Sequence, residues 1–369
     1  MKIFLILVLF INFSFSQRQV YESLNVHKEL LSAFENVIGN DYSNAIGSDN
    51  KTIFDIEYGP RDSGDGKVSA NSRSIFVSIN SAKLVYFYGN SFSKNRRYDL
   101  TRASEILKQD EFDNEKPTLL YIHGYTESLE SESIRVVSDA YFKRNDHNVI
   151  ILDWSKLAQG TYFASAVPNA FRLAGPLAEA VLDLIQDGLD IERLHVVGHS
   201  LGGQLAGALG RNIKEKSYQT KKLFRISALD PAFPGFYPST VYKALNKFDA
   251  KFVDVIHTNG MEMGAPVSTG SVDFWPNSGK NLQPGCGLGI RCSHHRSWRF
   301  WAETVESNKG KIFPAVKCAS WSDFKARKCD FDEVTYMGID CPTNVFGDYY
   351  LETNADTPYA KGLNGVKYY

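Results

Sequence analysis

Short runs of apolar residues, separated by turn-forming residues, recur along the middle of the chain. Continuous apolar runs of this length are typical of strands buried on both faces of a sheet. Between the third and fourth runs, Leu173, Leu177, Val181 and Leu184 follow at three- and four-residue steps, which predicts an amphipathic helix over Ala170–Ile185. Strands alternating with helices predict an α/β fold with a mostly parallel central sheet flanked by helices. The runs are Lys83–Tyr88, Thr118–Ile122, Val149–Trp154, Leu194–Val197, Phe224–Leu229 and Phe252–Ile256.

The N-terminal part of the chain has a different pattern. Residues 1–16 combine Lys2, an apolar run from Ile3 to Phe13 and small residues before a plausible cleavage point, which predicts a signal peptide and a secreted, extracellular protein. A membrane anchor is the alternative, but the run is shorter than the ~20 residues that span a bilayer, and no later segment is apolar enough to be transmembrane. Residues 17–67 are polar and interrupted by glycines, so we expect a leader or pro-segment before a domain over 68–369.

Composition narrows the class of function. With 43% hydrophobic and 22% charged residues the chain can build a large core, and its net charge of −1 argues against binding to nucleic acid. Asn50-Lys51-Thr52 is a glycosylation acceptor that secretion would make usable. All five cysteines lie in the last quarter, which in an oxidising compartment predicts local disulfides with one thiol left over, for which Cys341 is the candidate.

One pentapeptide carries hydrolytic chemistry. Gly198-His199-Ser200-Leu201-Gly202 fits G-x-S-x-G, the strand-to-helix turn that exposes a nucleophilic serine in α/β-hydrolases. The run Leu194–Val197 supplies the strand before it, and 201–209 can form the helix after it. A serine hydroxyl is a weak nucleophile, so it needs a histidine to accept its proton and an acid to orient that histidine, in the chain order Ser, Asp or Glu, His.

Several residues can fill the acid and base roles. Asp230 ends the run Phe224–Leu229 at the carboxyl edge where open α/β sheets place their sites, although it can also merely cap a turn. Asp254, inside a strand pattern, and Asp273 are weaker rivals. The histidines that follow are His257, His294 and His295. The adjacent pair also allows a metal reading, but no third ligand stands at a helical spacing, so we expect no metal.

The tetrahedral intermediate of ester hydrolysis needs two N–H donors for its oxyanion. The backbone N–H of Leu201, directly after the predicted nucleophile, is one candidate. The segment Tyr121-Ile122-His123-Gly124-Tyr125 ends a strand in a tight turn and points to the N–H of Tyr125 as the other. An ordinary glycine turn explains this second segment equally well on local evidence.

Taken together, these residues resemble the pancreatic lipase family, which includes secreted phospholipases A1. The matching pieces occur in the family's order from about Leu84 to the C-terminus, so the resemblance is far more specific than one pentapeptide. They are His123-Gly124-Tyr125, Asp153-Trp154, Gly198-His199-Ser200-Leu201-Gly202-Gly203, Leu229-Asp230-Pro231-Ala232 and Cys292-Ser293-His294-His295-Arg296-Ser297.

The resemblance implies an α/β-hydrolase fold that acts on lipid esters at a membrane or micelle surface without a cofactor. It implies Ser200 as nucleophile, Asp230 as orienting acid and His294 as base, with oxyanion donors at Tyr125 and Leu201. It also implies disulfides Cys286–Cys292, flanking the lid, and Cys318–Cys329.

The sequence departs from the digestive triacylglycerol lipases of that family. Only 287–291 lie between the lid cysteines, and the loop from His257 to Asp273 looks short. We also expect no C-terminal β-sandwich of the kind that recruits a helper protein in some relatives. These features resemble the phospholipase A1 branch and leave phospholipid, triacylglycerol and galactolipid esters open as substrates. Non-catalytic yolk-type lipid-binding proteins share the fold, but they usually lack the serine found here at Ser200.

Overall fold

The computed structural model of the chain describes residues 77–237, 242–280, 282–307 and 311–368. The predicted signal peptide 1–16, the predicted leader 17–67 and the acceptor Asn50 lie outside the described residues. The predicted hydrolase domain, 68–369, is described from Val77 onward.

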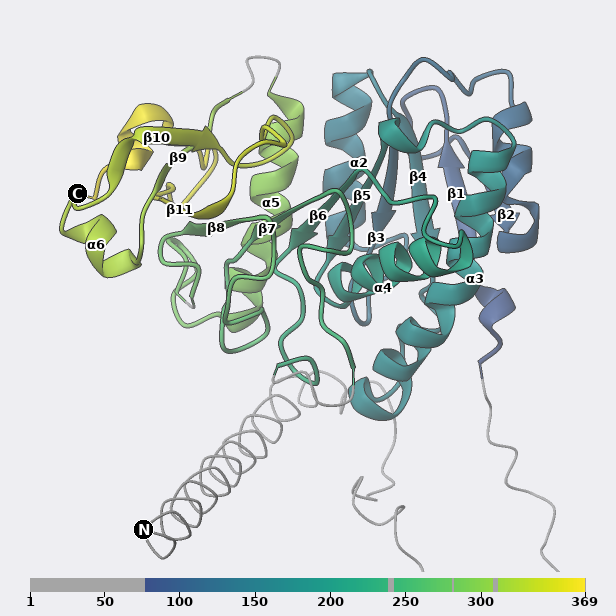
Figure 1. The fold of residues 1–369 in the computed structure, drawn as a ribbon, viewed down its shortest axis with the longest axis horizontal. Coiled ribbons are helices and arrows are strands. Elements are labelled where there is room, and N and C mark those ends of the chain that lie inside the picture. Colours follow the sequence, from purple (N-terminus) through teal and green to yellow (C-terminus); the bar gives the residue numbers. More distant parts are fainter. Residues whose placement is uncertain (1–76, 238–241, 281, 308–310, 369) are drawn as a thin grey trace, which may run out of the picture. The chain divides into compact units, whose positions relative to one another are not determined.

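One sheet forms the centre of the described residues (Figure 1). Its strand order is β10-β9-β11-β8-β7-β6-β5-β3-β4-β1-β2. From β4 through β3, β5, β6, β7 and β8 to β11, neighbouring strands run parallel, whereas β1, β2, β9 and β10 pair antiparallel at the two ends. The strands are β1 Lys83–Phe87, β2 Asn95–Asp99, β3 Thr118–Ile122, β4 Asn148–Asp153, β5 Leu194–His199, β6 Arg225–Leu229, β7 Phe252–Ile256, β8 Val272–Pro276, β9 Pro314–Lys317, β10 Asp330–Tyr336 and β11 Gly347–Leu351.

Helices flank this sheet, which confirms the predicted α/β-hydrolase architecture (Figure 1). Helix α3 packs on α4, and α2 packs on α5. No helix of the described residues is both long enough and apolar enough to cross a bilayer. The α-helices are α2 Glu132–Arg144, α3 Val167–Gln186, α4 Leu201–Lys216, α5 Ile290–Glu306 and α6 Trp321–Lys325, and the short helical segments are η2 Ile79–Ser81, η3 Leu100–Lys108, η4 Tyr162–Ala166, η5 Ile191–Arg193 and η6 Gly362–Val366.

The predicted periodicities correspond to real burial. Every residue of β3, β5, β6 and β7 is buried, as expected for strands covered on both faces. The predicted helix over Ala170–Ile185 lies within α3, and its four apolar positions are all buried. Sequence periodicity missed β2, β8, β9, β10 and β11. The edge strands β2 and β10 bury only part of their length and so lack a continuous apolar run. Asp273 and Asp348 interrupt the apolar pattern of β8 and β11, and β9 has only four residues.

Strand order brings the predicted site together. Strands β3, β5 and β6 are neighbours in the sheet, and His123, Ser200 and Asp230 follow their carboxyl ends directly. Because parallel strands end at the same edge, the three loops meet there, which is where open α/β sheets place their sites.

Both predicted disulfides are present, Cys286–Cys292 and Cys318–Cys329, with sequence separations of 6 and 11. Cys341 is a free, buried thiol, and burial raises its pKa, so it has the character of a core side chain. The short separations agree with the local pairing that cysteine spacing indicated, and the two pairings are those that the family resemblance implies.

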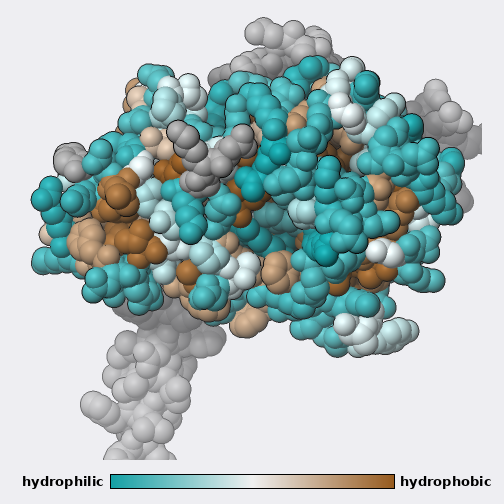
Figure 2. Space-filling model, turned by 90° about the horizontal axis from the view of Figure 1, so that it is seen from above, coloured by the Kyte–Doolittle hydropathy of each residue, from teal (hydrophilic) through white to brown (hydrophobic). Residues whose placement is uncertain are grey.

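The C-terminal end of the sheet carries an exposed apolar area. Figure 2 shows hydrophobic atoms gathered over the end of the molecule that contains β9, β10 and α6, on the left of the view. Strand β10 lies at the edge of the sheet and exposes Phe331 and Val334. Asp330, Asp332 and Glu333 of the same strand place charge on that edge, which disfavours pairing with another edge strand.

Candidate active site

Ser200 occupies a strained turn between β5 and α4. Its φ of 53° and ψ of −121° lie in a region that costs a non-glycine residue about 1–3 kcal/mol. The surrounding backbone holds the turn in place, since the Ser200 N–H donates to the Leu229 carbonyl at 3.0 Å and the Ala232 N–H donates to the Ser200 carbonyl at 3.1 Å. These two bonds place Ser200 beside the segment that contains Asp230.

Two glycines make this turn sterically possible. A Cβ on Gly198 would lie 2.4 Å from the Gly202 carbonyl oxygen, and a Cβ on Gly202 would lie 2.2 Å from the Ile122 carbonyl oxygen. Both contacts are with backbone, which cannot move aside as a flexible side chain would. The G-x-S-x-G pattern therefore reflects close packing of β5, α4 and β3 around the serine.

His294, in the second turn of α5, meets Asp230, which follows β6. The Nδ1 atom of His294 lies 2.6 Å from Oδ2 of Asp230, and both side chains are almost completely buried. A carboxylate only accepts, so Nδ1 carries the proton and Nε2 is left with its lone pair. This tautomer is the one that a general base needs in order to take a proton from a serine hydroxyl.

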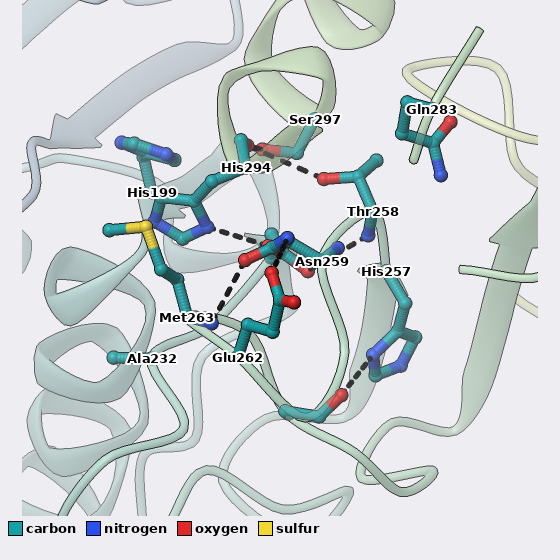
Figure 3. Close-up of polar contacts among 12 residues, drawn as sticks. His199, Ala232, His257, Thr258, Asn259, Glu262, Met263, Gln283, His294 and Ser297 are labelled. Atoms are coloured by element: carbon teal, nitrogen blue, oxygen red, sulfur yellow. Dashed lines mark hydrogen bonds and ion pairs between the residues drawn. The ribbon is translucent and has the colours of Figure 1, made fainter. Parts of the chain in front are cut away.

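The Asp230 carboxylate is fixed on its other side by backbone. Its Oδ1 accepts the N–H groups of Thr258 at 2.8 Å and Asn259 at 3.1 Å, in the loop after β7 (Figure 3). A Cβ on Gly264 would lie 2.2 Å from Oδ1, so this loop packs directly on the carboxylate. Both oxygens are therefore held, and the acid has one orientation toward His294.

Burial dominates the protonation of His294. Burial lowers the pKa of His294, the hydrogen bond and charge of Asp230 oppose that change, and the ring of His199 adds to the lowering. Its Nε2 is buried and has no hydrogen-bond partner among the described residues, the Ser200 hydroxyl included. Contacts of this kind are often long without substrate and tighten only in the complex.

The rival acids are engaged elsewhere in the core. The two carboxylate oxygens of Asp254 pair with Arg225 at 2.8 and 3.0 Å, and one of them also accepts the Ser227 hydroxyl. Asp273 accepts from Nε2 of His257 at 2.8 Å, and the His257 ring stacks on Trp275. Neither carboxylate is bonded to His294.

The rival histidines are also accounted for. The second nitrogen of His257, Nδ1, lies 3.1 Å from the Ala265 carbonyl, so both of its nitrogens have partners (Figure 3). His295 stands beside His294, and burial together with the rings of His199 and His294 lowers its pKa to about 3. No carboxylate hydrogen bond of the kind that holds His294 is recorded for His295 in the described part of the chain.

Two peptide units stand where oxyanion donors are expected. Leu201 begins α4, so its N–H belongs to the first helical turn, where no intrahelical acceptor exists. Gly124 lies against Ser200, because a Cβ there would be 3.1 Å from Cβ of that serine. Tyr125 is the next residue along the chain, so its N–H remains the second candidate donor.

No group of three or more metal-binding side chains occurs in residues 77–368, apart from the undescribed positions within that range. Nδ1 of His294 contacts Asp230, so Nε2 is the one ring nitrogen of His294 that could bind a metal.

Comparison with known proteins places this geometry in a family. The sequence model of the family described as Lipase matches residues 69–359. The chain belongs to the lipase family. Similar members include pancreatic lipase-related protein 2 of Cavia porcellus, 32% identical over 68% of this chain and 57% of that protein. Phospholipase A1 of Vespa crabro is 28% identical over 74% of this chain and 94% of its own length.

Lipoprotein lipase of Homo sapiens is 29% identical over 80% of this chain and 66% of that protein. The chain thus spans just over half the length of the pancreatic relative and nearly all of the Vespa phospholipase.

Sequence reasoning missed two residues at the site. Glu127, in the loop after β3, has a side chain that is only 13% exposed and pairs with Nδ1 of His199 at 3.1 Å. The His199 ring lies 4.8 Å from that of His294. A single acidic residue in a polar loop gives no signal of burial, so only the packing of this loop on β5 could reveal it.

Proposed function

We propose that this lipase-family chain is a secreted serine hydrolase that cleaves carboxylic esters of lipids, with Ser200, Asp230 and His294 as its triad. The observation that carries the proposal is the 2.6 Å contact from Nδ1 of His294 to Asp230 beside a strained serine turn. In this arrangement the proposed nucleophile, orienting acid and base follow one another along the chain in the order that α/β-hydrolases use.

The proposed reaction has two half-reactions. Nε2 of His294 takes the proton of Ser200 Oγ as that oxygen attacks the acyl carbonyl, and the N–H groups of Leu201 and Tyr125 stabilise the resulting oxyanion. The imidazolium then protonates the leaving alcohol, which departs and leaves an acyl-enzyme. Water, deprotonated by the same histidine, attacks the acyl carbon, releases the fatty acid and restores the Ser200 hydroxyl.

The substrate that we propose is a phospholipid, cleaved at its sn-1 acyl ester, with galactolipids or neutral glycerides as further substrates. The segment 287–291 lies between the disulfide-bonded Cys286 and Cys292 and contains two glycines. It is much shorter than the ~12 residues at which an isolated helix becomes marginal, so it cannot form an amphipathic helix by itself. Leu288 on it is 88% exposed. A lid of this size cannot bury an acyl groove, which favours substrates with polar head groups.

A neutral triacylglycerol lipase is the second candidate. Relatives named pancreatic triacylglycerol lipase are 29–30% identical to this chain, close to the identity of the Vespa phospholipases. If other loops cover the acyl-binding groove, the enzyme would be activated at an oil surface even though the segment 287–291 is short. A non-catalytic lipid-binding role is less consistent with the retained serine and its histidine.

Secretion is part of the proposal. It rests on residues 1–16 as a signal peptide, residues 17–67 as a leader and residues 68–369 as the hydrolase domain, and two disulfides are in keeping with an oxidising compartment. The proposed partner is a lipid surface, a membrane or a micelle.

The deciding experiment joins labelling to turnover. An organophosphonate should label Ser200, and Ser200→Ala should lower kcat by about 10⁴ or more without loss of fold, because the turn does not depend on the hydroxyl. Ser93→Ala, at an exposed serine between β1 and β2, is the matched control and should retain full activity. Labelling at another residue, or turnover by folded Ser200→Ala, would exclude the proposed nucleophile.

Substrate choice is tested separately on purified enzyme. Initial rates are measured on phosphatidylcholine, triolein and a short-chain nitrophenyl ester, at substrate concentrations below and above the aggregation threshold. We expect the highest rate on phosphatidylcholine and a smooth rise of the rate with concentration across that threshold. A steep increase at the threshold together with preference for triolein would instead support the triacylglycerol lipase.

A further inference from the structure

Glu127 is a nearly buried carboxylate next to the proposed nucleophile, and the reaction described above makes no use of it. It lies in the loop between β3 and α2. Its Oε2 accepts the Gly124 N–H at 2.5 Å and pairs with Nδ1 of His199 at 3.1 Å, while Oε1 accepts the Ser133 hydroxyl at 2.5 Å. Burying a carboxylate is costly, so three donors on two oxygens indicate a specific role for it.

These contacts converge on one point beside the serine. A Cβ on Gly124 would lie 3.0 Å from Oε2 of Glu127, 3.1 Å from Cβ of Ser200 and 3.2 Å from Nδ1 of His199. Gly124 is thus packed between the nucleophile and the Glu127–His199 pair. A side chain at this position would force the loop away from the serine.

Both peptide units that flank Gly124 are held. Its N–H donates to Glu127, as described above, and its carbonyl lies 3.0 Å from Nδ1 of His123. The ring of His123 is itself held by Trp154, whose N–H lies 3.4 Å from its Nε2 and whose indole donates to its carbonyl at 3.1 Å. Because a trans peptide directs its N–H opposite to its carbonyl, anchoring the Gly124 carbonyl aims the N–H of Tyr125.

We propose that Glu127 is a positioning residue for ester hydrolysis: its carboxylate holds the N–H of Gly124, and through the Gly124 backbone the next peptide with the Tyr125 oxyanion donor, and it presents the His199 ring to His294. This inference rests on the proposed triad. Glu127 acts through Gly124 and His199 and does not touch the reacting atoms.

The charge of Glu127 adds a second, separable effect. Burial acts to raise the pKa of Glu127, but His199, His123 and Ser133 more than offset it, so the pKa is held below its usual range and the group is an anion. The titratable groups in contact with or next to His294 are Asp230 after β6, His199 at the end of β5 and His295 on α5, and the charge of Glu127 acts on it from behind His199. Among them, Asp230 and Glu127 raise the pKa of His294. The anion therefore favours the imidazolium that forms during the reaction.

Two variants separate position from charge. Glu127→Gln keeps an oxygen for Gly124 and His199 and offers its NH₂ to the Ser133 hydroxyl, so we expect kcat to stay within about tenfold of the native enzyme. The acid limb of kcat/KM should move to lower pH, since the negative charge is gone. Glu127→Ala removes the acceptor, and kcat should fall by about 10- to 100-fold, less than the ~10²–10³ lost with an oxyanion donor itself.

The Glu127→Ala loss should appear in kcat and in the rate of phosphonate labelling, with KM changed by less than about threefold. Glu130→Gln, an exposed carboxylate in the same loop, is the control and should match the native enzyme in every measurement. If Glu127→Ala does not fold, Glu127→Gln still tests the inference through the pH profile.

The inference is overturned if folded Glu127→Ala retains the native kcat, if its loss appears in KM alone, or if the acid limb of Glu127→Gln does not move downward. If the native enzyme is not labelled at Ser200, the proposed function fails. If it is labelled at Ser200 and the Glu127 variants behave like Glu130→Gln, only this inference fails.

Discussion

Gly264→Ala is expected to inactivate the enzyme by displacing the proposed acid, without replacing any proposed catalytic side chain. The added Cβ would lie 2.2 Å from Oδ1, 2.4 Å from Cγ and 2.5 Å from Oδ2 of Asp230. The φ of Gly264 is not in the left-handed region, so alanine is compatible with the backbone and the clash is the main perturbation. Relief to an ordinary contact needs a displacement of roughly 1 Å of the carboxylate or of its loop.

A movement of that size breaks what holds the acid. The contact to Nδ1 of His294 is 2.6 Å and those from Thr258 and Asn259 are 2.8 and 3.1 Å, so 1 Å takes them beyond hydrogen-bond distance. Misplacement of a catalytic group by 1 Å costs about 10²-fold, and loss of the acid about 10⁴-fold. We therefore expect kcat to fall by about 10²- to 10⁴-fold.

The assay is turnover of a soluble nitrophenyl ester, with circular dichroism and thermal unfolding to establish the fold. Gly175→Ala is the matched control, since Gly175 lies inside α3 and, apart from its own helix, the nearest atom to its added Cβ would be 3.7 Å away. That variant should retain kcat, with no gain in the free energy of unfolding, because Gly175 precedes Pro176, whose ring crowds a Cβ at this position of a helix. Native kcat in folded Gly264→Ala would refute the argument that a fixed Asp230 is required.

Three further outcomes are expected. His294→Ala should abolish turnover of the nitrophenyl ester and His295→Ala should cost far less, and the reverse ranking would show that the register of the base is wrong by one residue. His294 acts as a base only when it is neutral, and burial lowers its pKa below the ordinary value of 6.5. Activity should therefore be lost only as the pH falls through that lowered pKa, which places the acid limb of kcat/KM below pH 6.5. An acid limb above pH 6.5 would contradict this. Replacing Cys286 and Cys292 by serine should lower the free energy of unfolding, measured by urea denaturation, by about 2 kcal/mol. This is the chain-entropy value for a disulfide with a sequence separation of 6, and an unchanged free energy would argue against that account.

Local features of this protein could be predicted from the sequence because their causes lie within a few residues. Period and run length predicted α3 and the buried strands, since burial on one or both faces leaves its repeat in the chain. The turn at Ser200 could be recognised because close backbone packing admits only glycine at Gly198 and Gly202. Both disulfides close short loops, so spacing and the family resemblance together anticipated them.

Which distant side chains meet was decided by the tertiary structure alone. Asp230, Asp254 and Asp273 all lie on or directly after buried strands, so local pattern could rank them as acids but could not name their partners. In the assembled sheet, Asp254 pairs with Arg225 and Asp273 bonds to His257. Asp230 instead contacts His294 of α5.

The same reason applies to Glu127, which local sequence would leave as a solvated residue of a polar loop. Its burial follows from the packing of the loop after β3 against the end of β5, which brings His199 to it across a sequence separation of 72. Periodicity records how each element is buried, whereas the partners of a buried charge depend on contacts between elements, and those exist only once the sheet has assembled.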